Sequence, residues 1–308
     1  MSSSPTADPE KLLAIILGEM TSHVASDATG ASPLFHQAAS LALRPAAISL
    51  AKQLLAFDAD LAITKNLRVS SLAMLARYGV NARLSDSSGG PADIAARRAA
   101  LPERGPMIVV SNHPGLFDAI ALFAAIGRED LAVIAAERDM LAALPNLRPY
   151  LLTAKADARG GFSLRAALRH LQKGGALLHF AAGRIEPDPR LLPPSADFLL
   201  PWKAGLETLI RLVLRTRKDL VVVPALVSGV VSPRARKVAL LLGRGGALTD
   251  AFVPLLQLTL PFFHDVDVRV SFADEKITKI TKNLGEEPER FCRDALARLA
   301  QNIARNAD

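Results

Sequence analysis

Cysteine and aromatic residues are scarce in this chain of 308 residues. The single cysteine, Cys292, excludes an internal disulfide and any metal site built from several thiolates, and we expect it to be a small apolar residue of a helix. Aromatic residues make up 5% of the chain, which leaves few rings on which nucleic-acid bases could stack. We therefore expect neither a thiolate metal centre nor a nucleic-acid partner.

Long hydrophobic runs are also absent. No uninterrupted apolar stretch approaches the roughly 20 residues that a membrane-spanning helix needs, and residues 1–20 lack the basic segment and apolar core of a signal peptide. We expect a protein on the cytoplasmic side that associates peripherally with a membrane. Residues 250–263, DAFVPLLQLTLPFF, are the candidate interfacial segment, and burial against the domain is the alternative that we favour.

Negative charge is the minority sign. Lys and Arg number 37 against 30 Asp and Glu, which gives a net charge of +7 and a pI near 9.8. This balance suits an anionic membrane surface, a phosphorylated substrate or nucleic acid, and charge alone does not choose among them. Hydrophobic residues at 50% and charged residues at 22% are typical of a globular protein.

Helical and strand-like patterns occupy different parts of the chain. Residues 11–80 carry apolar residues at helical spacing, and residues 84–106 are rich in Ser, Gly, Pro and charge, as linkers are. We expect a helical N-terminal region with its linker at 1–100, an α/β domain at 101–275, and a C-terminal helix within 276–308.

Beyond residue 100, β-like runs alternate with helix-like runs. Such alternation predicts the α/β class, with a central, mostly parallel β-sheet flanked by helices. The expected strands are 107–111, 130–136, 150–156, 175–181, 219–227, 237–243 and 266–273. The expected helices are at about 116–127, 163–172, 202–215 and 287–306.

Two further positions carry local expectations. Pro224, inside the run VVVPALV, cannot donate to a sheet ladder, so we expect a sheet edge, a strand end or a bulge there. His170 lies on a basic helix with Arg165 and Arg169, and we expect it to face solvent. His23, His36 and His264 have no clustered partners, so no metal site is expected.

His113 stands between an apolar run and a helix-like run, with Asp118 five positions later. On one ideal helix the two side chains would point roughly 140° apart. Pro114 and Gly115, however, favour a turn at the histidine and a helix that begins at the proline. Asp118 can then reach back to one imidazole nitrogen, while the other nitrogen faces the crevice at the strand ends, as a general base would. The alternative is a helix cap and dipole partner without catalysis.

The segment NHPGLFD, residues 112–118, resembles the N-H-x-x-x-x-D block of the glycerolipid acyltransferases, the family of 1-acylglycerol-3-phosphate acyltransferase. Residues 156–188 resemble the second and third blocks of that family, and residues 198–229 resemble its lysine-glycine helix and the Val-Pro strand that follows. Order and spacing agree over residues 107–229.

The resemblance implies a reaction and the residues that carry it out. His113 would take the proton of a lipid hydroxyl and Asp118 would orient it, and the hydroxyl would attack an acyl thioester, either acyl-CoA or acyl-carrier protein. Arg159 is the best match for the arginine that binds the acceptor's phosphate. No cofactor beyond the acyl donor and no metal is implied, and the acceptor is a lysolipid of the glycerol-phosphate type.

The third block departs from the family pattern. Gly183 matches its glycine, but Ala182 stands at the usual glutamate position and Arg184 adds positive charge. Arg184 follows the expected strand 175–181, so it would lie at the same crevice as His113 if the two strands are parallel, and an arginine suits phosphate. Glu186 is a positional substitute for the missing glutamate.

This departure keeps two other functions open. One is a non-catalytic lipid- or membrane-binding protein on the same fold. The other is an acyltransferase whose acceptor is a lyso-aminolipid or a glycolipid. An intact pair of His113 and Asp118 favours catalysis over the first of these.

Overall fold

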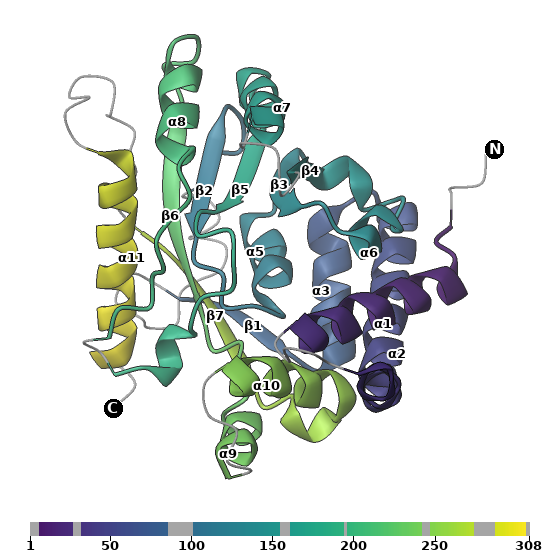
Figure 1. Cartoon of the computed structure of the whole chain (residues 1–308). Helices are drawn as coiled ribbons and strands as arrows, with labels where there is room; N and C mark the ends of the chain where they lie inside the picture. Colours follow the sequence, from purple (N-terminus) through teal and green to yellow (C-terminus); the bar gives the residue numbers. More distant parts are fainter. Residues whose placement is uncertain are drawn as a thin grey trace.

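The computed structural model describes residues 6–26, 32–85, 101–154, 161–193, 196–241, 247–273 and 287–305. Seven strands form one sheet in the order β1-β7-β6-β2-β5-β3-β4. Every neighbouring pair in this sheet is parallel except β6 and β7, which are antiparallel. The sheet is flanked by helices (Figure 1), so the predicted fold class is confirmed.

The strands are β1 (Asn81–Ser85), β2 (Met107–Ser111), β3 (Leu131–Ala136), β4 (Leu151–Ala154), β5 (Ala176–Phe180), β6 (Val221–Ser228) and β7 (Asp267–Phe272). The helices are α1 (Pro9–Ser26), α2 (Pro33–Thr64), α3 (Leu67–Tyr78), α5 (Asp118–Ile126), α6 (Asp139–Ala142), α7 (Gly161–Gln172), α8 (Leu206–Leu214), α9 (Pro233–Leu241), α10 (Ala247–Thr259) and α11 (Pro288–Arg305).

Helices cover both faces of the sheet. In Figure 1, α11 lies on one side of the strands and α1, α2 and α3 on the other. Successive side chains of β2 point to opposite faces of the sheet. Val109 packs into a core with α1, α2, α3 and α5, and Ile108 packs into a core with α7, α8 and α11. The central strands β2 and β6 are buried along their whole length, which is why they are continuous apolar runs in the sequence.

Two expectations about strands differ from the structure. The run expected as a strand at 237–243 is wrong, because its first residues continue α9, which begins at Pro233. The hydroxyl of Ser232 accepts the N–H of Ala235 and so caps this helix, and Ala235 and Ala239, one helical turn apart, are its buried contacts. No strand was expected before residue 107, yet β1 pairs with β7 along one edge of the sheet.

Pro224 lies within a central strand, β6, and not at an outer edge. Its carbonyl accepts the N–H of Ala273, just beyond the end of β7, at 2.9 Å. The antiparallel pairing of β6 with β7 begins only at Ala225. The expectation of a sheet edge, a strand end or a bulge at Pro224 is therefore wrong, because the proline lies inside β6. The side of Pro224 that lacks an N–H faces the point where β7 ends.

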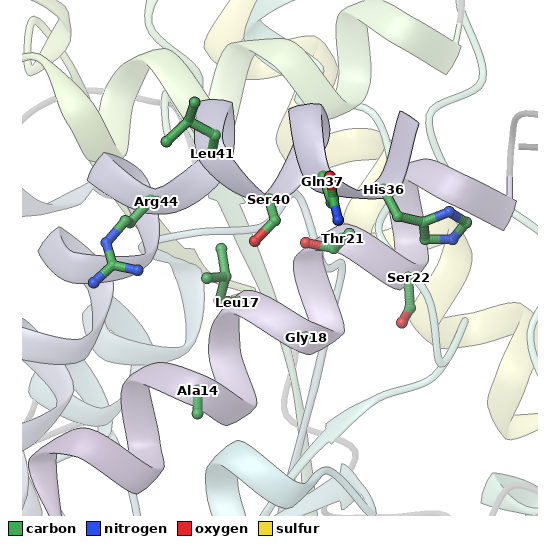
Figure 2. Close-up of a pocket in the computed structure, with 10 residues that line it drawn as sticks. All are labelled: Ala14, Leu17, Gly18, Thr21, Ser22, His36, Gln37, Ser40, Leu41 and Arg44. Atoms are coloured by element: carbon green, nitrogen blue, oxygen red, sulfur yellow. The ribbon is translucent and has the colours of Figure 1, made fainter. Parts of the chain in front are cut away.

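The N-terminal helices form a hollow that is separate from the sheet. Helices α1 and α2 border an open hollow of about 680 Å³, lined by Leu17, His36, Leu41 and Arg44 among others (Figure 2). The candidate interfacial segment lies beside α2: α10 contacts α2, and within the segment Val253 is buried. Burial of residues 250–263 against the domain was the favoured alternative. Val253, Leu258 and Phe263 are buried, whereas Leu260 and Phe262, after the end of α10, are exposed.

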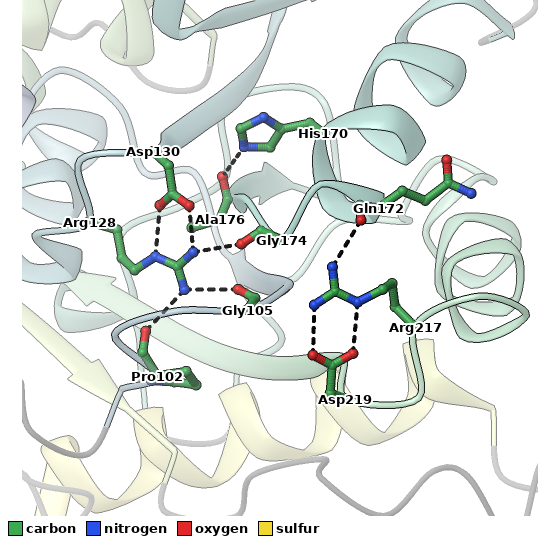
Figure 3. A network of polar contacts seen from close by, with 10 residues as sticks. All are labelled: Pro102, Gly105, Arg128, Asp130, His170, Gln172, Gly174, Ala176, Arg217 and Asp219. Atoms are coloured by element: carbon green, nitrogen blue, oxygen red, sulfur yellow. Dashed lines mark hydrogen bonds and ion pairs between the residues drawn. The ribbon is translucent and has the colours of Figure 1, made fainter.

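The amino ends of the central strands are joined by a buried arginine (Figure 3). The side chain of Arg128 is 5% exposed and pairs with Asp130. Its guanidinium also donates to the carbonyls of Pro102, Gly105 and Gly174, at 3.1, 2.9 and 2.9 Å. Because these residues precede β2, β3 and β5, one side chain fixes the starts of three strands.

A second clamp lies beside it. Arg217 pairs with Asp219 and donates to the carbonyl of Gln172 at 2.9 Å (Figure 3). His170 is half-buried and its Nε2 lies 2.8 Å from the carbonyl of Ala176. The expectation that His170 faces solvent is wrong, because the ring closes the turn into β5.

Candidate active site

The candidate site lies where two parallel strands end side by side. In the register of β2 and β5, Ser111 is the partner of Phe180. The carboxyl ends of both strands therefore lie at the same edge of the sheet, which is where open α/β sheets bind ligands. His113 follows β2, and the residues from Ala181 onward follow β5. The expected parallel arrangement of these two strands is confirmed.

Asn112 fixes the first residue after β2. It is completely buried, and its side-chain amide donates to the carbonyl of Val227 while its oxygen accepts the N–H of the same residue, both at 2.8 Å. The side chain thus continues the ladder between β2 and β6 by one more step. These two hydrogen bonds anchor the backbone just before His113 to β6.

The turn from β2 into α5 has an unusual backbone. Gly115 has φ 98° and Leu116 has φ 28°, a region that residues with a Cβ rarely adopt. Glycine takes this conformation without a steric cost, whereas Leu116 takes it against its own side chain. The left-handed turn prevents a helix from starting at Pro114, so that expectation is wrong. Helix α5 begins at Asp118, which is in its first turn as predicted.

This turn brings His113 and Asp118 together. The imidazole Nδ1 lies 2.7 Å from the Asp118 Oδ2, and the same oxygen accepts the Gly115 N–H at 2.7 Å. The Asp118 side chain is 2% exposed and that of His113 is 27% exposed. Since a carboxylate accepts, the proton of the neutral ring is held on Nδ1, and Nε2 is left as the basic nitrogen.

The surroundings change the basicity of His113. Burial on its own disfavours the charged ring, but the charge and hydrogen bond of Asp118 and the charge of Glu186 outweigh it and raise the pKa of His113 above its ordinary value. Phe180 fixes the plane of the ring, because the two rings stack with centroids 4.3 Å apart and planes 28° apart. The ring is thus held at its edge and on its face.

Glu186 lies next to His113 and not toward solvent. It is 2% exposed, and its two carboxylate oxygens accept the backbone N–H groups of His113 and Leu200. Burial raises the pKa of Glu186, against the lowering effect of these two hydrogen bonds and of the charges of His113 and Arg293. Both carboxylate oxygens are therefore used by the protein's own backbone and are not presented to a ligand. The expectation for Glu186 was that it substitutes by position for the missing glutamate of the third block.

The other predicted residues after β5 are placed as follows. Gly183 has φ 62°, and a Cβ there would lie 3.0 Å from the Lys203 Cδ, so glycine allows the lysine stem to cross it closely. Arg184 is exposed, and Ala182, at the glutamate position of the resembled family, is 1% exposed. Arg159 lies outside the described residues.

Lys203 is a second cation near this turn. Its backbone N–H donates to the carbonyl of Ala181 at 3.0 Å, so it is tied to the chain that leaves β5. Together with Arg184, it places two exposed cationic side chains in the loop region next to the carboxyl end of β5.

Other reactive groups are less suited to chemistry. Burial lowers the pKa of His179 to about 4 and raises the pKa of the Cys292 thiol to about 12, with Glu289 adding to the effect. His179 is therefore neutral and Cys292 is an unreactive thiol, in line with its expected structural role. Within the described ranges there is no group of three or more His, Cys, Asp or Glu side chains that could hold a metal ion.

Two contributors to the site were missed by sequence reasoning. Phe180 precedes Ala181 in the third block, and its place beside His113 follows only from the register of β2 with β5. The signal was available once those strands are taken as parallel neighbours. Asn112 is part of the NH pair, but the residue that it binds, Val227, is 115 positions away, and no local pattern indicates that contact.

No protein-family model matches the chain, and no curated protein matches it. Among solved structures, it is similar to a crystal structure described as the 1-acyl-sn-glycerophosphate (LPA) acyltransferase, PlsC, from Thermotoga maritima. The sequence identity is 16% and the TM-score is 0.46, over 77% of this chain and 78% of the other chain.

Proposed function

We propose that this protein is an O-acyltransferase that moves a fatty acyl group from a thioester to a hydroxyl of a lysolipid. The observation that carries the proposal is the 2.7 Å contact between the His113 Nδ1 and the Asp118 Oδ2 at the carboxyl end of β2. This geometry supports a general base with its orienting carboxylate. The resemblance of residues 107–229 to the glycerolipid acyltransferases supports a lysolipid acceptor for this base.

The chemistry needs only groups that this site or its substrates hold. The Nε2 of His113 takes the proton of the acceptor hydroxyl as the hydroxyl oxygen attacks the thioester carbonyl carbon. The tetrahedral intermediate then collapses, the carbon–sulfur bond breaks, and the leaving thiolate takes the proton back from the imidazolium. Asp118 stabilises the imidazolium between these two steps, and the histidine ends the cycle neutral.

The acceptor is proposed from the cations beside the base. Arg184 and Lys203 are exposed next to Gly183, where they can bind an anionic head group such as a phosphate. Arg159 joins them in this proposal through the resemblance alone. Ala182 stands at the glutamate position of the resembled family and its side chain is buried, so an acceptor other than lysophosphatidic acid, including a lyso-aminolipid or a glycolipid, is part of the same proposal.

We also propose that the protein works at the cytoplasmic surface of an anionic membrane. The described helices include none that is long and apolar enough to cross a bilayer. Exposed apolar side chains gather instead on α2, at Leu34 and Leu41, and after α10, at Leu260 and Phe262. Helices α2 and α10 are in contact with each other. Arg44 beside Leu41 and the net charge of +7 suit anionic lipid.

The test is direct acylation of a panel of acceptors. The protein is incubated with acyl-CoA or acyl-carrier protein and with lysophosphatidic acid, other lysophospholipids, a lyso-aminolipid and a lysoglycolipid, and the new ester is identified by mass spectrometry. An ester that requires both donor and acceptor supports the transferase and names its acceptor. Lipid binding without any ester would instead support the non-catalytic lipid-binding protein.

A further inference from the structure

The backbone N–H and the backbone carbonyl of His113 both form hydrogen bonds with Glu186. The His113 N–H donates to the Glu186 Oε2 at 2.9 Å, and the His113 carbonyl accepts the Glu186 N–H at 2.7 Å. Glu186 is 73 positions further along the chain and 2% exposed. A two-way contact of this kind fixes both the position and the direction of the histidine backbone.

The carboxylate of Glu186 is itself anchored from the far side. Its Oε1 accepts the Leu200 N–H at 2.9 Å, and the Leu200 carbonyl accepts from the Arg293 guanidinium at 2.9 Å. Arg293 lies on α11 and over the ring of Trp202, 5.5 Å from its centroid. A continuous chain of hydrogen bonds thus joins the C-terminal helix to the backbone of His113.

We propose that Glu186 is a positioning residue for the proposed reaction, which holds the His113 backbone in place and provides a second carboxylate that stabilises the charged imidazole. This inference rests on the proposed function only for its kinetic consequence. It assigns Glu186 a role other than contact with the acceptor, because both of its oxygens are used by backbone N–H groups.

The charges around His113 come from several elements. Asp118 faces it from α5 and Glu186 from the chain after β5, while Arg293 from α11 acts on Glu186. Lys203, ahead of α8, lies against Gly183 in the same loop region. Two of the four are carboxylates that favour the imidazolium, so loss of the Glu186 charge lowers the pKa of His113.

The experiment is a titration of His113 by NMR. The imidazole signals of the full-length protein are followed with pH in the wild type and in Glu186→Gln, and the His113 signal is assigned by its absence from His113→Ala. The glutamine removes the charge and keeps the size of the side chain. The pKa of His113 is expected to fall in Glu186→Gln, and an unchanged pKa would overturn the inference.

Asp188→Asn is the matched control. Asp188 is a buried carboxylate two residues away whose oxygens accept the N–H groups of Arg190, Gly229 and Val231, and none from His113. Its removal disturbs the same loop, so it is expected to reduce stability and to leave the pKa of His113 unchanged. An equal shift of that pKa in both variants would show that Glu186 acts only by holding the loop, and it would overturn the electrostatic part.

Kinetics separate this inference from the proposed function. In Glu186→Gln, kcat is expected to fall about tenfold with the acceptor KM unchanged, and the acidic limb of the pH profile is expected to move to lower pH. Glu186→Asp keeps the charge on a shorter side chain, so its kcat is expected to fall while its pH profile stays near that of the wild type. This variant also serves as the test if Glu186→Gln does not fold. An unchanged kcat in Glu186→Asp would overturn the inference. A shifted pKa in a protein without acyl transfer would remove the proposed function alone, and acyl transfer with an unshifted pKa would remove this inference alone.

Discussion

The imidazole of His113 stacks on the ring of Phe180, with centroids 4.3 Å apart, while Asp118 holds its edge. The two rings come from neighbouring parallel strands, since Phe180 ends β5 and His113 follows β2. The orientation of the proposed base is therefore set by the sheet register as well as by the local turn. This arrangement leads to several measurable consequences.

Replacing Phe180 by leucine should reduce catalysis more than stability. The stacked contact is worth about 1 kcal/mol, and its loss lets the His113 ring tilt, so kcat is expected to fall about fivefold. The measurement is kcat on the substrate pair found in the acceptor panel. Phe263→Leu, in the small core of α9 and α10, is the control and should keep kcat. Equal losses in both variants would mean that the stack has no special role.

Asp118→Asn should destabilise the fold in a pH-dependent way. The folded pKa of His113 is raised, so its pair with Asp118 stabilises the fold fully below the unfolded pKa and ceases to do so as pH rises through the folded pKa. The variant is expected to lose about 2 kcal/mol of unfolding free energy at about pH 5.5 and less at about pH 8.5, by urea denaturation. Asp60→Asn, which breaks the exposed pair with Arg77, should show no such trend. A larger loss at the alkaline pH would contradict the assignment.

Arg128→Ala should damage stability and not chemistry. The substitution leaves the carbonyls that precede β2 and β5 without their donor, and the expected loss is about 3 kcal/mol in unfolding free energy. The comparison is Arg217→Ala, whose side chain is 28% exposed and whose loss is expected to be smaller. Folded Arg128→Ala is expected to keep the wild-type kcat, because the clamp lies at the opposite end of the strands from His113. A normal stability with a reduced kcat would contradict this division.

Membrane binding should depend on Leu34 and Leu41, the exposed leucines in the first part of α2. The double variant Leu34→Glu, Leu41→Glu changes side chains that are 77% and 74% exposed, so the fold should tolerate it. Flotation with vesicles that contain anionic lipid is expected to fall about tenfold. Ile63→Glu, 83% exposed on the same helix and about 33 Å from Leu41 along it, is the matched control. Equal flotation of the two variants, or flotation that does not depend on anionic lipid, would contradict the membrane proposal.

Much of the fold could be predicted from local sequence patterns. The buried parallel strands β2 and β6 are continuous apolar runs, and the Pro-Gly turn before Asp118 indicates that His113 and Asp118 can meet. Helix α9 was missed because its apolar residues are consecutive, and only the Ser232 cap and the burial of two alanines distinguish it from a strand. β1 was missed because Asn81 and Arg83 are exposed, which leaves no apolar run, and because its pairing with β7 depends on a segment far along the chain.

The supporting residues of the site were harder to predict, because their partners are remote in sequence. Glu186 was noted for its position in the third block, but its contact with the His113 backbone depends on how the chain returns after β5. Asn112 and Phe180 depend in the same way on the register of β2 with β6 and with β5. Motif spacing identifies side chains with the right chemistry, and sheet topology decides which of them meet.

The most direct test of the account is thiol release from the acyl donor in the presence of the acceptor, compared between the wild type and His113→Ala of verified fold. His36→Ala is the control, since His36 is exposed on α2 and its Nδ1 contacts only the Ser32 carbonyl among the described hydrogen bonds. Loss of a proposed general base should reduce acceptor-dependent release by at least about a hundredfold, with His36→Ala near the wild type. Release that is unchanged in His113→Ala would contradict the role of His113 as the base.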